Sequence, residues 1–326
     1  MRIHRGPAAV FSVFLQQREE LRPPLPKNRM GRPAEATRTD GDWGIAMSKQ
    51  RKKKPIFRII VLLICVPVFC LSAYKVSSQL IVEHKEKGAF SELVEQVNRA
   101  RSVEPEQAEV PSEDQPEEPN AEPGATPVPQ ILSAYAPLYA QNPDFFGWIE
   151  IEGTEINYPV MHTPEDSEYY LHRAFDRSYS FSGVPFLDGK CSLDCGNYIV
   201  YGHNMKNGTM FARIPRYSSE DYWKEHPVIR FDTLYETGTY EVIAAFYSKA
   251  YPADAVGVFR YYQYTDLRDS ERFAEYMEQV KAASLYNTGI DAEYGDQLLT
   301  LSTCEYHATD GRFVVVAKKR TENPIS

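Results

Sequence analysis

The sequence predicts a mainly β domain over residues 131–326, preceded by one membrane-spanning helix and an acidic linker. From Ile131 onward, short runs rich in Val, Ile, Tyr and Phe alternate with Gly, Asn and Asp, a pattern typical of many short strands. The apolar run Ile56–Tyr74 lies before that domain and is long enough to cross a bilayer. The 326 residues are 43% hydrophobic and 25% charged, which allows a real core but is too polar for a polytopic membrane protein.

Charge and cysteine content exclude two broad classes. The net charge is −9, and residues 131–326 hold 17 Lys and Arg against 28 Asp and Glu, so the bulk of the chain is acidic. Phosphate binding needs a concentrated basic surface, and we therefore expect no nucleic-acid partner. The five cysteines are too few to act as a disulfide framework for a chain of this length. The chain is therefore predicted to be a tethered globular protein with its own hydrophobic core.

The N-terminal region divides at a basic cluster. Residues 1–46 are rich in Arg and Pro without periodicity, and Met47 stands directly before the basic segment 47–55, so we predict that 1–46 is a start-site artefact or a cytoplasmic tail. Because Lys and Arg stay on the cytoplasmic side, residues 56–74 are predicted to be a signal anchor with its N-terminus in the cytoplasm. A cleaved signal peptide is the alternative, although no clear small-residue cleavage site follows.

Two segments connect the anchor to the β domain. Apolar residues at moderate helical spacing predict a helical stalk over 75–102. Residues 103–130 then hold seven prolines and eight acidic residues, a composition that predicts a disordered spacer.

Within 131–326 the pattern predicts eight strands and two helices. Asp269 or Ser270 is the predicted N-cap of a helix that runs to about residue 286, and residues 131–146 are predicted to form another helix that ends at Asn142-Pro143. The predicted strands are Gly147–Ile151, Asn157–His162, Gly183–Leu187, Asn197–Tyr201, Val228–Asp232, Thr239–Tyr247, Gln297–Thr303 and Arg312–Ala317.

The last two strands bring a thiol and a guanidinium together. If they pair as an antiparallel hairpin, Cys304 and Arg312 meet across its open end. A fixed positive charge favours the thiolate, which is the nucleophilic form, or binds an oxygen opposite it. The alternative is that Cys304 packs as a small apolar residue and Arg312 is a surface charge.

A thiol nucleophile also needs a proton acceptor. His203 follows an apolar strand in a Gly-containing loop, a common place for an accessible imidazole. His307 is the rival because it lies three residues from Cys304. His162, His172 and His226 have no such context and are predicted to be surface or satisfied core groups.

These segments resemble the sortases, the membrane-anchored cysteine transpeptidases of Gram-positive bacteria, and the class B members most closely. The resemblance covers about residues 131–320. Its main motifs are Tyr-Gly-His-Asn-Met at 201–205, Leu-Thr-Leu-Ser-Thr-Cys-Glu-Tyr at 299–306 and Arg-Phe-Val-Val-Val-Ala at 312–317, supported by Gly-Trp-Ile at 147–149, Asn-Tyr-Pro-Val at 157–160 and Tyr-Tyr-Leu at 169–171.

The resemblance implies a closed, eight-stranded β-barrel with peripheral helices and a cell-wall sorting reaction that needs no cofactor. Cys304 would attack a Thr carbonyl in the sorting signal of a surface protein and form a thioester. His203 would protonate the leaving amine, and Arg312 would orient the substrate or stabilise the oxyanion. A peptidoglycan cross-bridge or lipid II amine would then resolve the thioester, on the outer face of the cell membrane.

Further residues are candidates for supporting roles. Thr303 and the backbone N–H of Glu305 could help to hold the oxyanion, although Thr303 is equally a β-branched strand former. Cys191 and Cys195 could form a disulfide or stay reduced, and no further ligands are spaced for a metal site.

Two other function classes stay open at this point. One is another envelope cysteine peptidase or an L,D-transpeptidase, and the other is a non-catalytic, membrane-tethered binding module in which Cys304 is structural. Papain-like hydrolases usually place Cys before His, and the Ser-His-Gly-Cys pattern of L,D-transpeptidases is absent from the sequence, so the first of these is disfavoured.

Overall fold

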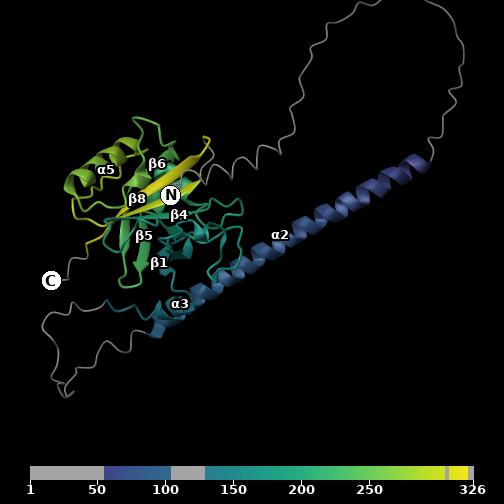
Figure 1. Cartoon of the computed structure of the whole chain (residues 1–326), viewed down its shortest axis with the longest axis horizontal. Coiled ribbons are helices and arrows are strands. Elements are labelled where there is room, and N and C mark those ends of the chain that lie inside the picture. Colours follow the sequence, from purple (N-terminus) through teal and green to yellow (C-terminus); the bar gives the residue numbers. More distant parts are fainter. Residues whose placement is uncertain (1–54, 104–128, 305–307, 322–326) are drawn as a thin grey trace, which may run out of the picture. The chain divides into compact units, whose positions relative to one another are not determined.

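The computed structural model describes residues 55–103, 129–304 and 308–321 (Figure 1). The predicted N-terminal segment 1–46, the basic cluster and nearly all of the spacer 103–130 lie outside these residues. Backbone contacts divide the chain into two compact units, one of which contains Glu86–Ser326 and the other Leu15–Lys85.

The first described element is the long helix α2 (Pro55–Val103). Its apolar side chains from Leu62 to Val82 are largely exposed, as Phe69 is at 75%. Among the described residues it is the one helix long and apolar enough to cross a membrane, by length and composition. Exposed apolar side chains on such a helix are what a lipid-facing segment requires.

Eight strands in the described residues pair into a closed ring, as the mainly β prediction expects. Their order around the ring is β1-β2-β3-β4-β7-β8-β6-β5, with parallel pairs at β2·β3 and β4·β7 and antiparallel pairs elsewhere. The strands are β1 (Phe145–Glu150), β2 (Asn157–Met161), β3 (Phe186–Leu187), β4 (Asn197–Gly202), β5 (Val228–Thr233), β6 (Thr239–Lys249), β7 (Leu298–Cys304) and β8 (Gly311–Lys319).

Two predicted elements are shorter than expected. The strand predicted over Gly183–Leu187 keeps only its last two residues. Gly183 adopts a positive φ of 60°, the Val184 N–H bonds to the Tyr170 carbonyl instead of a strand, and Pro185 has no N–H to donate. The helix predicted over 131–146 is a short α3 (Ala136–Gln141), since Phe145 already begins β1. Short helices and 3₁₀ turns fill the connections: η2 (Tyr169–His172), η3 (Ile214–Ser218), α4 (Glu220–Glu225) and η4 (Tyr261–Gln263).

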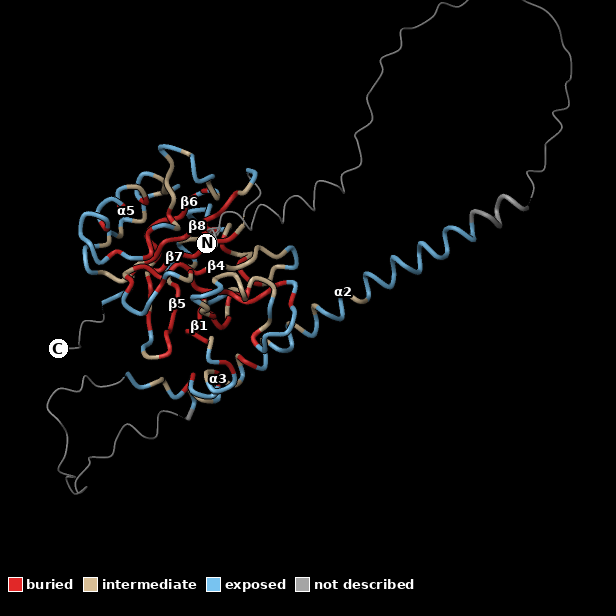
Figure 2. Tube along the Cα trace, viewed as in Figure 1, coloured by how far each residue is buried: buried red, intermediate tan, exposed pale blue. Residues whose placement is uncertain are grey.

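The core lies on both sides of the strands, which are buried along most of their length (Figure 2). Alternation sends Leu299 and Leu301 of β7 into the cluster inside the ring, and Leu298 to the opposite face. There Leu298 packs under helix α5 (Ser270–Ala283), whose N-cap Asp269 accepts a hydrogen bond from the Arg272 N–H, as predicted.

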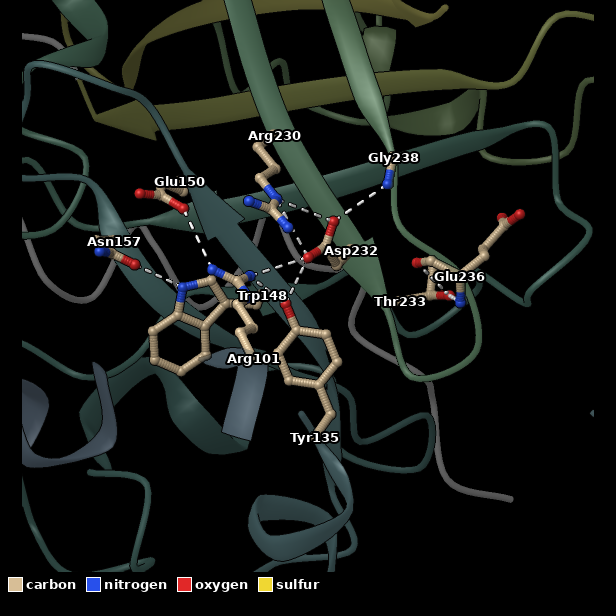
Figure 3. Close-up of polar contacts among 10 residues, drawn as sticks. All are labelled: Arg101, Tyr135, Trp148, Glu150, Asn157, Arg230, Asp232, Thr233, Glu236 and Gly238. Carbon is tan, nitrogen blue, oxygen red and sulfur yellow. Dashed lines mark hydrogen bonds and ion pairs between the residues drawn. The ribbon is translucent and has the colours of Figure 1, made fainter. Parts of the chain in front are cut away.

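The C-terminal end of α2 is tied to the strands by a buried carboxylate. Asp232 of β5 is 1% exposed and accepts hydrogen bonds from the Tyr135 hydroxyl at 2.6 Å and from Arg101 Nη2 at 3.0 Å (Figure 3). The Gly238 N–H donates to the other Asp232 oxygen, Oδ1, at 3.1 Å, and Arg230 Nε lies 3.4 Å from Asp232 Oδ2. Burial of a charge is tolerated when it is paired in this way, so this network fixes the end of α2 against β5.

Candidate active site

Three neighbouring strands of the ring bring the predicted site residues to one edge. Strands β4 and β7 run parallel with Gly202 opposite Thr303. The next residue on each side is His203, which directly follows β4, and Cys304, which is the last residue of β7. In the antiparallel pair of β7 and β8, Cys304 lies opposite Arg312, which confirms the predicted hairpin register. One cleft is lined by all three residues, together with Leu171, Phe186, Tyr201, Gly202, Ser302 and Thr303.

The His203 ring is held by its two neighbours from the η2 segment. Its Nε2 lies 2.9 Å from the Leu171 carbonyl oxygen, and the ring stacks on that of His172 at a centroid distance of 5.5 Å. A carbonyl only accepts, so Nε2 carries the proton and Nδ1 is the ring's acceptor atom. Burial lowers the pKa of His203 to about 4; the Leu171 hydrogen bond opposes this, whereas His172 and Arg312 add to it. The imidazole is therefore neutral near pH 7 and able to accept a proton.

Cys304 ends β7 and is partly exposed to the cleft. Burial raises the pKa of its thiol, and the positive charge of Arg312 opposes that shift. The Asn204 amide donates to the Cys304 backbone carbonyl at 2.9 Å and so fixes the end of the strand beside the His203 loop. The raised thiol pKa and the lowered imidazole pKa thus leave both side chains neutral near pH 7.

Arg312 is buried at 7% exposure yet reaches the cleft. Its Nη1 donates to the carbonyls of Asp310 and Gly311 at 3.2 and 2.9 Å, which fixes the guanidinium at the open end of the hairpin. The fixed charge lowers the pKa of both His203 and Cys304, so it favours a neutral imidazole and a thiolate at the same time. A buried guanidinium with several N–H groups is also suited to holding a carbonyl oxygen or an oxyanion.

The supporting candidates differ in what the structure shows. The Thr303 hydroxyl donates to the Gly202 carbonyl at 2.7 Å, which ties the ends of β7 and β4 together. A role for Thr303 at the oxyanion stays a prediction, and Glu305 and His307 lie outside the described residues. No group of three metal-binding side chains occurs among the residues that the structure describes.

Cys191 and Cys195 are buried free thiols in the core cluster inside the ring. Their Sγ atoms lie 3.5 and 3.3 Å from the carbonyl oxygen of Asn197, to which both donate. Burial raises the pKa of Cys191, so this thiol is protonated and unreactive near neutral pH. The disulfide between the two stays a prediction.

The sequence did not predict that Leu171 and His172 of η2 contact His203. Leu171 contacts His203 through its backbone carbonyl, which carries no signal in the side-chain pattern, and His172 was expected to be a surface or satisfied core group. Tyr261 is buried, and its hydroxyl lies 2.7 Å from the Oγ of Ser302, which lines the cleft.

The chain matches a known family and its solved structures. A family model described as the Sortase domain matches residues 149–320. The chain is 32% identical to Sortase B of Listeria monocytogenes over 57% of this chain and 73% of that protein. It is 27% identical to Sortase B of Staphylococcus aureus over 80% of this chain and 96% of that protein. The Staphylococcus aureus sortase B-substrate complex superposes with a TM-score of 0.60 at 25% identity, covering 74% of this chain and all of that one.

Proposed function

Because the chain belongs to the sortase family, the cysteine transpeptidases that sort surface proteins, and is similar to its class B members, we propose that Cys304, His203 and Arg312 are its catalytic residues. The observation that supports this assignment is the register of β4, β7 and β8, which brings the three to one cleft. A neutral imidazole beside a thiol and a buried guanidinium is the arrangement that acyl transfer through a thioester needs.

The proposed reaction has two halves. His203 Nδ1 takes the thiol proton as Cys304 attacks the carbonyl of a Thr in a sorting signal, and Arg312 stabilises the developing oxyanion. The imidazolium then protonates the leaving amine, which leaves a thioester on Cys304. A peptidoglycan amine enters, loses its proton to His203, attacks the thioester carbonyl and regenerates the thiol.

We also propose the placement of the enzyme in the cell. The apolar part of α2 would be the single membrane anchor with its N-terminus in the cytoplasm, and residues 131–326 would form the catalytic domain outside a Gram-positive cell. Surface proteins that carry sorting signals and a peptidoglycan amine would be its partners. As a thiol-dependent hydrolase, it would release the acyl group to water only slowly when an amine is present.

The test is transpeptidation of a panel of sorting-motif peptides with a short amine nucleophile, followed by mass spectrometry. The wild-type chain should join the amine to the peptide at the Thr carbonyl, whereas Cys304→Ala and His203→Gln should not. Cys191→Ser is the matched control, because it removes a buried thiol that does not line the cleft and has no proposed catalytic role. Equal product from Cys304→Ala and the wild type would refute the assignment.

A further inference from the structure

A loop beside the site is held by a carboxylate from the membrane-proximal helix. Glu86 lies on α2 and accepts a hydrogen bond from Ser180 Oγ at 2.7 Å and a second, shorter one from Ser182 Oγ. The two serine hydroxyls are 3.3 Å apart, and Ser180 Oγ also accepts from the Gly183 N–H at 3.1 Å. Charge-assisted hydrogen bonds of this kind are about twice as strong as neutral ones, so Glu86 holds the 180–183 turn in one conformation.

The same turn is packed onto the η2 segment. The Ser180 N–H donates to the His172 carbonyl at 3.1 Å, and the Val184 N–H donates to the Tyr170 carbonyl at 3.2 Å. Between these bonds, Gly183 approaches the Leu171 carbonyl so closely that a Cβ atom would overlap it. The backbone of residues 170–172 is therefore fixed by the turn that Glu86 holds.

The η2 segment in turn positions the imidazole. The Leu171 carbonyl accepts from His203 Nε2 at 2.9 Å, and His172 stacks on the same ring. We propose that Glu86 is a positioning residue for His203, acting through Ser180, Ser182 and the Leu171 carbonyl. This inference rests on the proposed role of His203 and deepens it, because it connects the helix that carries the candidate anchor to the acid/base group.

A carboxylate suits this place because two hydroxyl donors converge on it. A Gln side chain keeps one acceptor oxygen but presents an amide N–H₂ to the second serine, and an Ala side chain leaves both hydroxyls without this partner. Without Glu86 the 180–183 turn is released and the Leu171 carbonyl moves. The hydrogen bond from His203 Nε2 to that carbonyl, which favours the imidazolium form of His203, then weakens. The titration of His203 should therefore shift, which a loss of stability alone does not cause.

The experiment compares Glu86→Ala, Glu86→Gln and Ser182→Ala in the full chain, reconstituted in lipid nanodiscs. Glu92→Gln is the matched control, since Glu92 is an exposed acid on the same helix. The first readout is the pH titration of His203 by NMR with ¹³C-labelled histidine, assigned by its loss in His203→Gln. The second is kcat/KM for acylation by a sorting-motif peptide.

We expect Glu86→Ala to lower kcat/KM about tenfold, because a misplacement of about 1 Å can cost about 10²-fold and a smaller displacement costs less. We also expect it to move the His203 pKa downward. Glu86→Gln and Ser182→Ala should give smaller changes in the same direction, and Glu92→Gln none. An unchanged His203 titration in Glu86→Ala would overturn the inference, even if activity falls. The titration needs no substrate, so absence of acylation by any peptide would count against the proposed function alone.

Discussion

Replacement of Asp232 by Asn should destabilise the folded protein strongly although it keeps the side-chain shape. One carboxylate oxygen accepts from Tyr135 and Arg101, and the other accepts from the Gly238 N–H (Figure 3). An Asn side chain must turn its N–H₂ group toward one of these two sets of donors. Either orientation leaves at least one donor facing another donor in a site that is 1% exposed.

The size of the effect follows from those partners. Leaving a buried donor unsatisfied costs about 1–3 kcal/mol, and breaking a buried ion pair costs about 3–5 kcal/mol. Part of Arg101 is exposed, at 23%, and can regain water, so about 3 kcal/mol is the expected loss in the free energy of unfolding. For a domain of this size that corresponds to a fall in Tm of roughly 6–12 °C.

The assay is thermal unfolding of the full chain in detergent, followed by tryptophan fluorescence. Arg230→Gln is the control, because the Arg230 side chain is 44% exposed and the carboxylate keeps its hydrogen bonds to Tyr135, Arg101 and Gly238, so we expect a loss of only about 1 kcal/mol. Tyr135→Phe should lie between the two, since it removes one hydrogen bond. The two expected losses differ by about 2 kcal/mol, which corresponds to a Tm difference of at least about 4 °C. A Tm for Asp232→Asn within about 2 °C of that of Arg230→Gln would refute the reasoning.

Three further predictions concern the site. Arg312→Gln removes the positive charge, so the pKa values of Cys304 and His203 should both rise, and kcat for acylation by a sorting-motif peptide should fall by about 10²–10³. Arg312→Lys should lose less activity in the same peptide assay, because it keeps the charge. Gly183→Ala places a methyl group against the Leu171 carbonyl at a backbone position with positive φ, so Tm and the acylation rate should both fall. Wild-type values of both would contradict the close contact between Gly183 and Leu171. Alkylation of Cys304 by iodoacetamide, followed by peptide mass spectrometry, should still be accelerating above pH 8 because burial raises the thiol pKa; a rate that is already maximal at pH 6 would show a thiolate in the resting enzyme.

Local patterns in the sequence were enough to predict the hairpin end of the site. Two apolar runs joined by a short loop predict an antiparallel hairpin, and the observed register of Cys304 with Arg312 is as predicted. His203 was predicted from its place directly after an apolar strand. Its closeness to Cys304 could not be derived locally, because the parallel pairing of β4 with β7 joins segments about 100 residues apart.

The supporting contacts had no signal in the sequence. The Leu171 carbonyl is a backbone atom, and its approach to His203 depends on the conformation of η2 rather than on residue type. Glu86 reads as one more charge on a stalk helix, and Ser180 and Ser182 read as loop residues, until folding brings the two segments together. A buried acid such as Asp232 within a strand is equally ambiguous, because only tertiary structure supplies its donors.

The central claim is that Cys304 carries the acyl group, and intact mass spectrometry of the full chain tests it most directly. The wild type, the Cys304→Ala variant and the Cys191→Ser control are incubated with each sorting-motif peptide without an amine and then quenched in acid. The account predicts that one peptide adds the mass of its acyl part to the wild type and to Cys191→Ser, that peptide mapping places it on Cys304, and that Cys304→Ala gains nothing. An adduct of the same mass on Cys304→Ala, or one mapped to another residue, would contradict it.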